Sequence, residues 1–146
     1  MTANNPSPHY AGDLSATEAW ALLKSDPRAR LVDVRTAAEW NFVGLPDLGA
    51  LGRDVQLVEW QVFPTMQPNA AFVADTEQGA GADKDAPVLL LCRSGARSRS
   101  AAIALTQAGY TRAYNVAGGF EGDLDGARHR GGKNGWKAAG LPWKQT

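Results

Sequence analysis

Short apolar runs alternate with helix-like stretches along the chain, and this alternation indicates the fold class. Residues 31–34 form a short apolar, β-branched run typical of a strand, and residues 113–116 are predicted to form the final strand. Residues 88–91 are four apolar residues in succession, which leaves no face for water and predicts a fully buried strand. Strands that alternate with helices predict a mainly parallel α/β sheet flanked by helices, with right-handed crossovers.

The helical stretches are marked by their caps. Ser15, with Glu18 three residues later, makes a capping box ahead of a helix over residues 16–24, and we expect ordered structure to begin at Ser15. Further helices are predicted over residues 35–40, over 70–78 between an Asn69 cap and a Gly79 stop, and over 98–109. A weaker β-like run covers residues 55–60, and a Gly-rich flexible stretch covers residues 79–82.

Length and composition indicate one globular domain. The 146 residues are 44% hydrophobic and 21% charged, which is typical of a globular chain. We expect a flexible N-terminal tail over residues 1–12 and one domain over 13–146. The N-terminus has no leader-like pattern and no apolar run approaches the roughly 20 residues that span a bilayer. We therefore predict a cytoplasmic protein with no membrane association.

The net charge is zero, which argues against a dedicated nucleic-acid binder, but the charge is unevenly distributed. Residues 1–87 carry 6 Lys or Arg and 12 Asp or Glu, whereas residues 88–146 carry 9 and 3. Either folding mixes the two halves and cancels the difference, or the second half contributes to an anion-attracting site.

Cys92 is the only cysteine, so the chain can form no internal disulfide and no Cys-rich zinc site, and a reducing compartment suits it. It stands where the buried run 88–91 ends and a Gly- and Arg-containing loop begins, ahead of a predicted helix. In a parallel sheet, ligands bind at this end of the strands. Backbone N–H groups, the positive end of a helix and nearby cations all stabilise a thiolate, so we predict a reactive Cys92.

The loop after Cys92 supplies the other candidate site residues. Its N–H groups can form an anion-binding nest, and Gly95 permits the backbone angles that such a nest requires. The predicted substrate-binding residues are Arg93, Ser94, Gly95, Ala96, Arg97 and Ser98. Arg93 is expected to contact substrate, whereas Arg97 either braces the loop or contacts substrate, and Arg97 or Arg99 could also be an ordinary helix residue or an ion-pair partner of Asp33 or Glu39.

Four sequence strings, in this order, resemble single-domain rhodaneses, which are sulfurtransferases. The strings are residues 31–35 followed by Glu39 and Trp40, residues 88–98, residues 114–120 and residues 139–142. The resemblance implies a rhodanese-like fold in which Cys92 takes a sulfane sulfur from a donor such as thiosulfate and passes it, as a persulfide, to cyanide or a thiol. No metal and no organic cofactor are indicated. Asp33 and Arg35 are expected to support the loop by hydrogen bonds or an ion pair, and a salt bridge with Glu39 is equally compatible.

The chain departs from this family pattern in three places. Residues 41–46 replace a Gly-His-Ile-type segment, the middle is enlarged over residues 58–86, and an insertion over about residues 122–134 displaces the expected Trp to Trp136. The enlarged segments could form a lid or docking surface walled by Trp60, Phe63 and Trp136, although core packing is the more common role of such aromatics. Neither His9 nor His129 suits a general base.

Three functions therefore compete. The leading one is sulfur transfer through a Cys92 persulfide, with a small anionic sulfur donor, a thiol or cyanide acceptor, and a sulfur-relay protein as a further partner. The second is a non-catalytic binding module for an anionic or sulfur-carrying partner. The third is a phosphatase or arsenate reductase, which loop length disfavours: only four residues separate Cys92 from Arg97, whereas the related Cdc25-type phosphatases have five.

Overall fold

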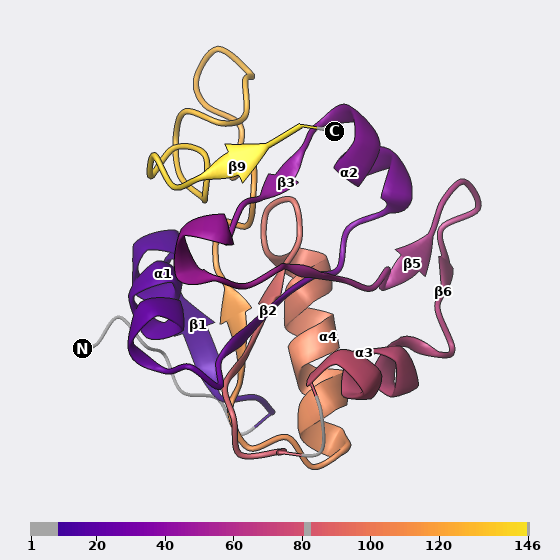
Figure 1. Cartoon of the computed structure of the whole chain (residues 1–146). Coiled ribbons are helices and arrows are strands. Elements are labelled where there is room, and N and C mark those ends of the chain that lie inside the picture. The colour runs from indigo at the N-terminus through magenta and orange to yellow at the C-terminus, as the bar shows by residue number, and fades with distance from the viewer. Residues whose placement is uncertain (1–8, 81–82, 146) are drawn as a thin grey trace.

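A five-stranded parallel sheet forms the centre of the molecule (Figure 1). The computed structural model describes residues 9–80 and 83–145. The strand order is β1-β8-β7-β2-β4, and every neighbouring pair in this sheet is parallel. The strands are β1 (Gly12–Leu14), β2 (Arg30–Asp33), β4 (Gln56–Leu57), β7 (Val88–Leu91) and β8 (Ala113–Val116). The prediction of a mainly parallel α/β sheet is confirmed.

Helices cover both faces of the sheet, as Figure 1 shows. They are α1 (Ala16–Ser25), α2 (Ala37–Phe42), α3 (Phe72–Ala80) and α4 (Ala96–Gln107), with a short 3-10 helix at Gly49–Leu51. Because side chains alternate along a strand, Leu90 of β7 packs with α3 and α4, while Leu89 and Leu91 pack with α1. Two apolar clusters thus bury β7 on both faces, which confirms the interpretation of its unbroken apolar run.

Two small antiparallel pairs lie outside the main sheet. β3 (Leu45–Pro46) pairs with β9 (Trp143–Lys144), so the C-terminal segment lies beside the connection after α2. β5 (Gln61–Val62) and β6 (Gln67–Pro68) form a hairpin in the enlarged middle of the chain. Trp136 is fully buried in the core, where it packs edge-on against Trp20. Trp60 is partly buried and packs against the core residue Phe72.

Several predicted boundaries are wrong. Structure begins before Ser15, because β1 pairs with β8 and Tyr10 is buried in the core. Residues 1–8 of the predicted tail, and residues 81–82 of the predicted flexible stretch, lie outside the described residues. The run 55–60 forms only the short edge strand β4. Gly79 does not end its helix but continues it, where its missing side chain leaves room for the amide of Gln56.

A buried ion pair at the end of β2 joins the sheet to its surroundings. Asp33 and Arg35 both have no exposed surface, and the Arg35 guanidinium donates to both Asp33 carboxylate oxygens at 2.7–3.2 Å. Arg35 also donates to the Gly44 carbonyl at 2.7 Å, and its Cζ lies 4.2 Å from the centre of the Phe120 ring. The pair therefore connects β2 with the segment before β3 and with the turn after β8.

Asp33→Ala is expected to lower the free energy of unfolding by about 3–5 kcal/mol, because it leaves the Arg35 charge buried without its partner. Urea unfolding followed by circular dichroism measures this loss. Replacing both charges in Asp33→Leu/Arg35→Met should recover most of it, since no unpaired charge remains. A single variant within about 1 kcal/mol of wild type would show that the pair does not hold this region.

Candidate functional site

Cys92 follows β7 at the carboxyl end of the sheet and is only 1% exposed. The loop after it turns at Gly95, whose φ of 118° lies in the region that favours glycine, and α4 begins at the next residue. This turn directs the Gly95 N–H at the Cys92 Sγ, with 3.1 Å between nitrogen and sulfur. Residues 96–98 form the first turn of α4, where N–H groups have no acceptor within the helix, so this end of α4 favours negative charge on the sulfur.

Ser98 makes the second polar contact with the sulfur. It lies one turn into α4, is fully buried, and places its hydroxyl oxygen 3.2 Å from the Cys92 Sγ. Of the other predicted loop residues, Ser94 is half-buried, while Arg93 and Ala96 are exposed. The structure thus brings Gly95 and Ser98 into direct contact with the sulfur and places Arg93 on the outer side of the loop.

The turn after β8 forms backbone hydrogen bonds with the Cys92 and Arg93 carbonyls. The Phe120 N–H donates to the Cys92 carbonyl at 2.8 Å, and the N–H groups of Glu121 and Gly122 donate to the Arg93 carbonyl at 3.0 Å. Gly119 allows this approach, because a Cβ there would lie 2.4 Å from the Cys92 carbonyl oxygen, and its φ of 60° is left-handed. The first two residues of the loop are therefore fixed by backbone contacts.

Arg97 forms a two-point ion pair with Glu39, which lies on α2. Its two Nη atoms donate to the two Glu39 carboxylate oxygens at 2.8 and 3.0 Å. Burial alone would raise the pKa of Glu39, but the Arg97 hydrogen bonds, the Thr36 N–H and the Arg97 charge outweigh it and lower that pKa from 4.5 to about 2. The Glu39 hydrogen bonds raise the pKa of Arg97, with smaller contributions from the negative charges of Cys92 and Asp33.

This contact resolves the predicted ion pairs. Glu39 pairs with Arg97, as one of the predicted alternatives has it, and the alternative salt bridge between Glu39 and Arg35 is not formed, because Arg35 pairs with Asp33. Asp33 and Arg35 pair with each other and reach the loop only indirectly, through Phe120. Arg97 thus braces the loop against α2, while the same side chain also lines the opening described next.

A hollow of about 470 Å³, here called the mouth, opens beside the loop. Its lining combines three arginines, two glutamates and three other side chains: Arg93, Arg97, Arg130, Glu39, Glu121, Val43, Gln61 and Met66. Arg130 comes from the insertion, where it donates to the Gly122 carbonyl at 2.7 Å. Sequence reasoning missed Arg130, because only the folded turn brings it beside Arg93.

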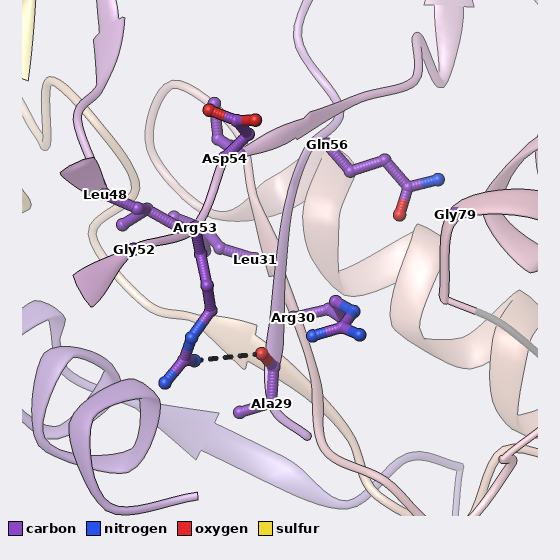
Figure 2. Close-up of a pocket in the computed structure, with 10 residues that line it drawn as sticks. Ala29, Arg30, Leu31, Leu48, Gly52, Arg53, Asp54, Gln56 and Gly79 are labelled. Carbon is purple, nitrogen blue, oxygen red and sulfur yellow. Dashed lines mark hydrogen bonds between the residues drawn. The ribbon is translucent and has the colours of Figure 1, made fainter. Parts of the chain in front are cut away.

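A second hollow, of about 410 Å³, lies at the β4 edge of the sheet (Figure 2). Figure 2 shows Arg53 extending along it to donate to the Ala29 carbonyl at 3.1 Å. Arg53 also donates to the Leu23 carbonyl near the end of α1. None of the predicted site residues lines this hollow, so the mouth beside Cys92 is the candidate site.

Comparison with known proteins identifies the family. The family model described as a rhodanese-like domain matches residues 15–124. The chain belongs to the rhodanese-like domain family. Most of the insertion, with Arg130, lies beyond the end of this match.

Relatives of this rhodanese-like chain cover nearly its whole length. The crystal structure of Rv0390 from M. tuberculosis has 51% identity and a TM-score of 0.85, and the match covers 94% of this chain and 99% of that one. An uncharacterized protein of Rickettsia conorii is 36% identical over 90% of this chain and 96% of its own. The thiosulfate sulfurtransferase GlpE of Actinobacillus pleuropneumoniae is 25% identical over 89% of this chain and 90% of its own.

Two further findings describe the rhodanese-like chain. Within residues 9–80 and 83–145, no group of three or more His, Cys, Asp or Glu side chains is arranged to hold a metal ion. No helix in the same ranges combines the length and apolar character needed to cross a membrane.

Glu39→Gln is expected to make the free energy of unfolding fall less steeply as the pH is lowered below about 4.5. The pKa of Glu39 is lower in the folded state, so its ionised form stabilises the fold above about pH 4.5, and this contribution is lost as the pH falls toward 2. The free energy of unfolding of the wild type should exceed that of the variant by about 1–2 kcal/mol near neutral pH, allowing for solvent screening, and this difference should vanish at low pH.

Urea unfolding at a series of pH values measures this dependence. Glu77→Gln is the matched control, because Glu77 makes an exposed pair with Lys84, and it should follow the wild-type curve closely. Parallel curves for wild type and Glu39→Gln would contradict the proposed strength of the Arg97 pair.

Proposed function

We propose that this rhodanese-like protein is a sulfurtransferase that moves a sulfane sulfur from thiosulfate to a thiol or cyanide through a Cys92 persulfide. The observation that carries the proposal is the Gly95 N–H aimed at the Cys92 sulfur, in a segment whose Arg93 and Arg97 line the mouth. A donor at this position stabilises charge on the sulfur, and the arginines attract an anionic donor. The thiosulfate sulfurtransferase relative supports the same chemistry.

The reaction consists of two displacements at the same sulfur. The Cys92 thiolate attacks the outer sulfur of thiosulfate, the S–S bond breaks, and its electron pair leaves with sulfite. Cyanide or a thiolate then attacks the outer sulfur of the persulfide, which releases thiocyanate or a new persulfide and restores the Cys92 thiolate. Each step requires a positioned nucleophile and a stabilised anion, and neither requires a general base.

The residues around Cys92 divide these tasks. We assign Gly95 and Ser98 to the sulfur itself, together with the N–H groups of Ala96 and Arg97 at the start of α4. Arg93 and Arg130 are assigned to the anionic donor, because they line the mouth without an ion-pair partner among the described residues. Arg97 keeps the loop in place through Glu39. Asp33 and Arg35 support the loop through Phe120.

The acceptor side is open to a small thiophile or to a sulfur-relay protein. Met66 of the β5–β6 turn lines the mouth and is 37% exposed, and Phe63 of the same turn is 56% exposed. These side chains give a protein partner apolar surface at the β5–β6 turn, where Met66 lines the mouth. A single cysteine working as a thiolate also suits the reducing cytoplasm, which we propose as its compartment.

Incubation with thiosulfate is expected to add the mass of one sulfur atom to the protein, and cyanide should remove it. The reason is that Cys92 is the only thiol that can hold the persulfide. Intact-protein mass spectrometry measures the gain, and Cys92→Ser is the control that should show none. An unchanged wild-type mass would exclude thiosulfate as the donor and favour the binding-module alternative.

Arg130→Gln and Arg93→Gln are each expected to raise the KM for thiosulfate about three- to tenfold, with little change in melting temperature. Both variants remove one positive charge from the mouth. Lys133→Gln is the matched control, because it removes the same charge from an exposed position in the same insertion. Steady-state kinetics at low ionic strength measures the KM for thiosulfate of each variant, which should rise in Arg93→Gln and Arg130→Gln but not in Lys133→Gln.

Equal effects in all three variants would show that the overall charge, and not the mouth, binds the donor. A fall in melting temperature that parallels the loss of activity would make Arg93 or Arg130 structural instead.

A further inference from the structure

Ser98 has one hydroxyl proton and two neighbours that can receive it. Its oxygen lies 3.2 Å from the Cys92 Sγ and 2.6 Å from the Oδ1 of Asn115 on β8. A serine hydroxyl donates one hydrogen bond at a time, although its oxygen can accept others. The shorter contact therefore competes with the sulfur for the Ser98 proton.

Asp13 fixes the side of the Asn115 amide that faces Ser98. The Asn115 Nδ2 lies 3.0 Å from the Asp13 Oδ1, and β1 and β8 place these two residues opposite each other. An ionised carboxylate only accepts hydrogen bonds, so the amide must turn its NH₂ toward Asp13 and its oxygen toward Ser98. The Asn115 oxygen is thereby held as an acceptor for the Ser98 proton.

Tyr10 completes the chain of contacts. Its hydroxyl donates to the same Asp13 oxygen at 2.8 Å. Burial, and then the hydrogen bond to Asp13, raise the pKa of Tyr10, so the hydroxyl remains a donor. Cys92, Ser98 and Asn115 are all at least 96% buried, so water does not readily replace these contacts.

We propose that Asn115 is a positioning residue that sets the proton of Ser98, and through it the charge state of Cys92. At rest the Ser98 proton points to Asn115, so the Ser98 oxygen is an acceptor for the Cys92 S–H and favours the thiol. When the sulfur ionises, its proton leaves to water and the Ser98 hydroxyl turns from Asn115 to the sulfur. Ionisation therefore breaks the buried hydrogen bond from Ser98 to Asn115. This proposal rests on the proposed function only in taking Cys92 as the reacting residue.

Other charged groups lie on the elements around the sulfur, and the variants Asn115→Leu and Ser98→Ala leave all of them in place. They come from the loop, from α4, from the end of β2 and from β1: Arg93, Arg97, the Asp33–Arg35 pair and Asp13. Arg97 interacts directly with the Cys92 charge and opposes the effect proposed for Asn115. Asn115→Leu and Ser98→Ala change no charge, so their differences report on the Ser98 proton. Asp13→Asn removes the Asp13 charge and is therefore compared with and without Ser98.

Asn115→Leu is expected to lower the pH midpoint of Cys92 ionisation by about one pH unit, because Ser98 then has no competing acceptor. The thiolate absorbance in the ultraviolet, measured against the same variant carrying Cys92→Ser, reports this midpoint for the one cysteine of the chain. In a Ser98→Ala background, the same Asn115→Leu change should have no effect. A midpoint that is unchanged or rises, or a shift that persists without Ser98, would overturn the proposal.

Asp13→Asn provides a second variant that preserves shape if Asn115→Leu folds poorly. A neutral amide at position 13 can accept or donate, so Asn115 can reverse its amide and release the Ser98 proton. The midpoint should fall more with Ser98 present than in Ser98→Ala, where only the loss of the Asp13 charge acts. Equal falls in both backgrounds would contradict the proposal. The titration uses no sulfur donor, so a failure of sulfur transfer would leave its result standing.

Discussion

The position of Cys92 depends on the close backbone contact between Gly119 and the Cys92–Arg93 peptide. A side chain at Gly119 would overlap the Cys92 carbonyl oxygen, and the contact aligns the next three N–H groups with the carbonyls of Cys92 and Arg93. Phe120, within this turn, covers the guanidinium of Arg35, which the Asp33 carboxylate holds in turn. Contacts therefore connect β2 to the Cys92 peptide through Arg35 and Phe120. The conformation of the loop thus depends on buried contacts with distant residues as well as on its own residues.

The arginines near the site have different tasks because their partners differ. Arg35 is buried with Asp33, and Arg97 is tied to Glu39, so the charge of each is largely compensated. Arg93 and Arg130 have no such partner among the described residues and face the mouth. The positive excess in the second half of the chain is therefore only partly paired, and Arg93 and Arg130, which belong to the unpaired part, make the mouth a place of positive charge.

The sequence alone was sufficient where neighbouring residues determine structure. The Ser15–Glu18 capping box, the buried run of β7 and the turn at Gly95 all follow from local chemistry, and all three are present. Contacts between distant segments were not predictable in this way. Nothing local to Arg130 places it beside Arg93, and nothing local to Tyr10 indicates that β1 continues the sheet beyond β8. Asn115 could have been noticed as a polar residue in a buried strand, but its partners Asp13 and Ser98 precede it by 102 and 17 residues, so no local pattern connects the three.

The contacts on the sulfur differ in whether they can change. The Gly95 N–H is fixed by the backbone and donates to the sulfur in every state, so it always favours the anion. The Ser98 hydroxyl can rotate, and the geometry of Asn115 and Asp13 gives its proton another acceptor. One sulfur therefore has a fixed donor, the Gly95 N–H, and a donor that can rotate, the Ser98 hydroxyl. Because the sulfur is only 1% exposed, the groups that contact it are those of the protein, and the direction of the Ser98 hydroxyl decides how many of them donate to it.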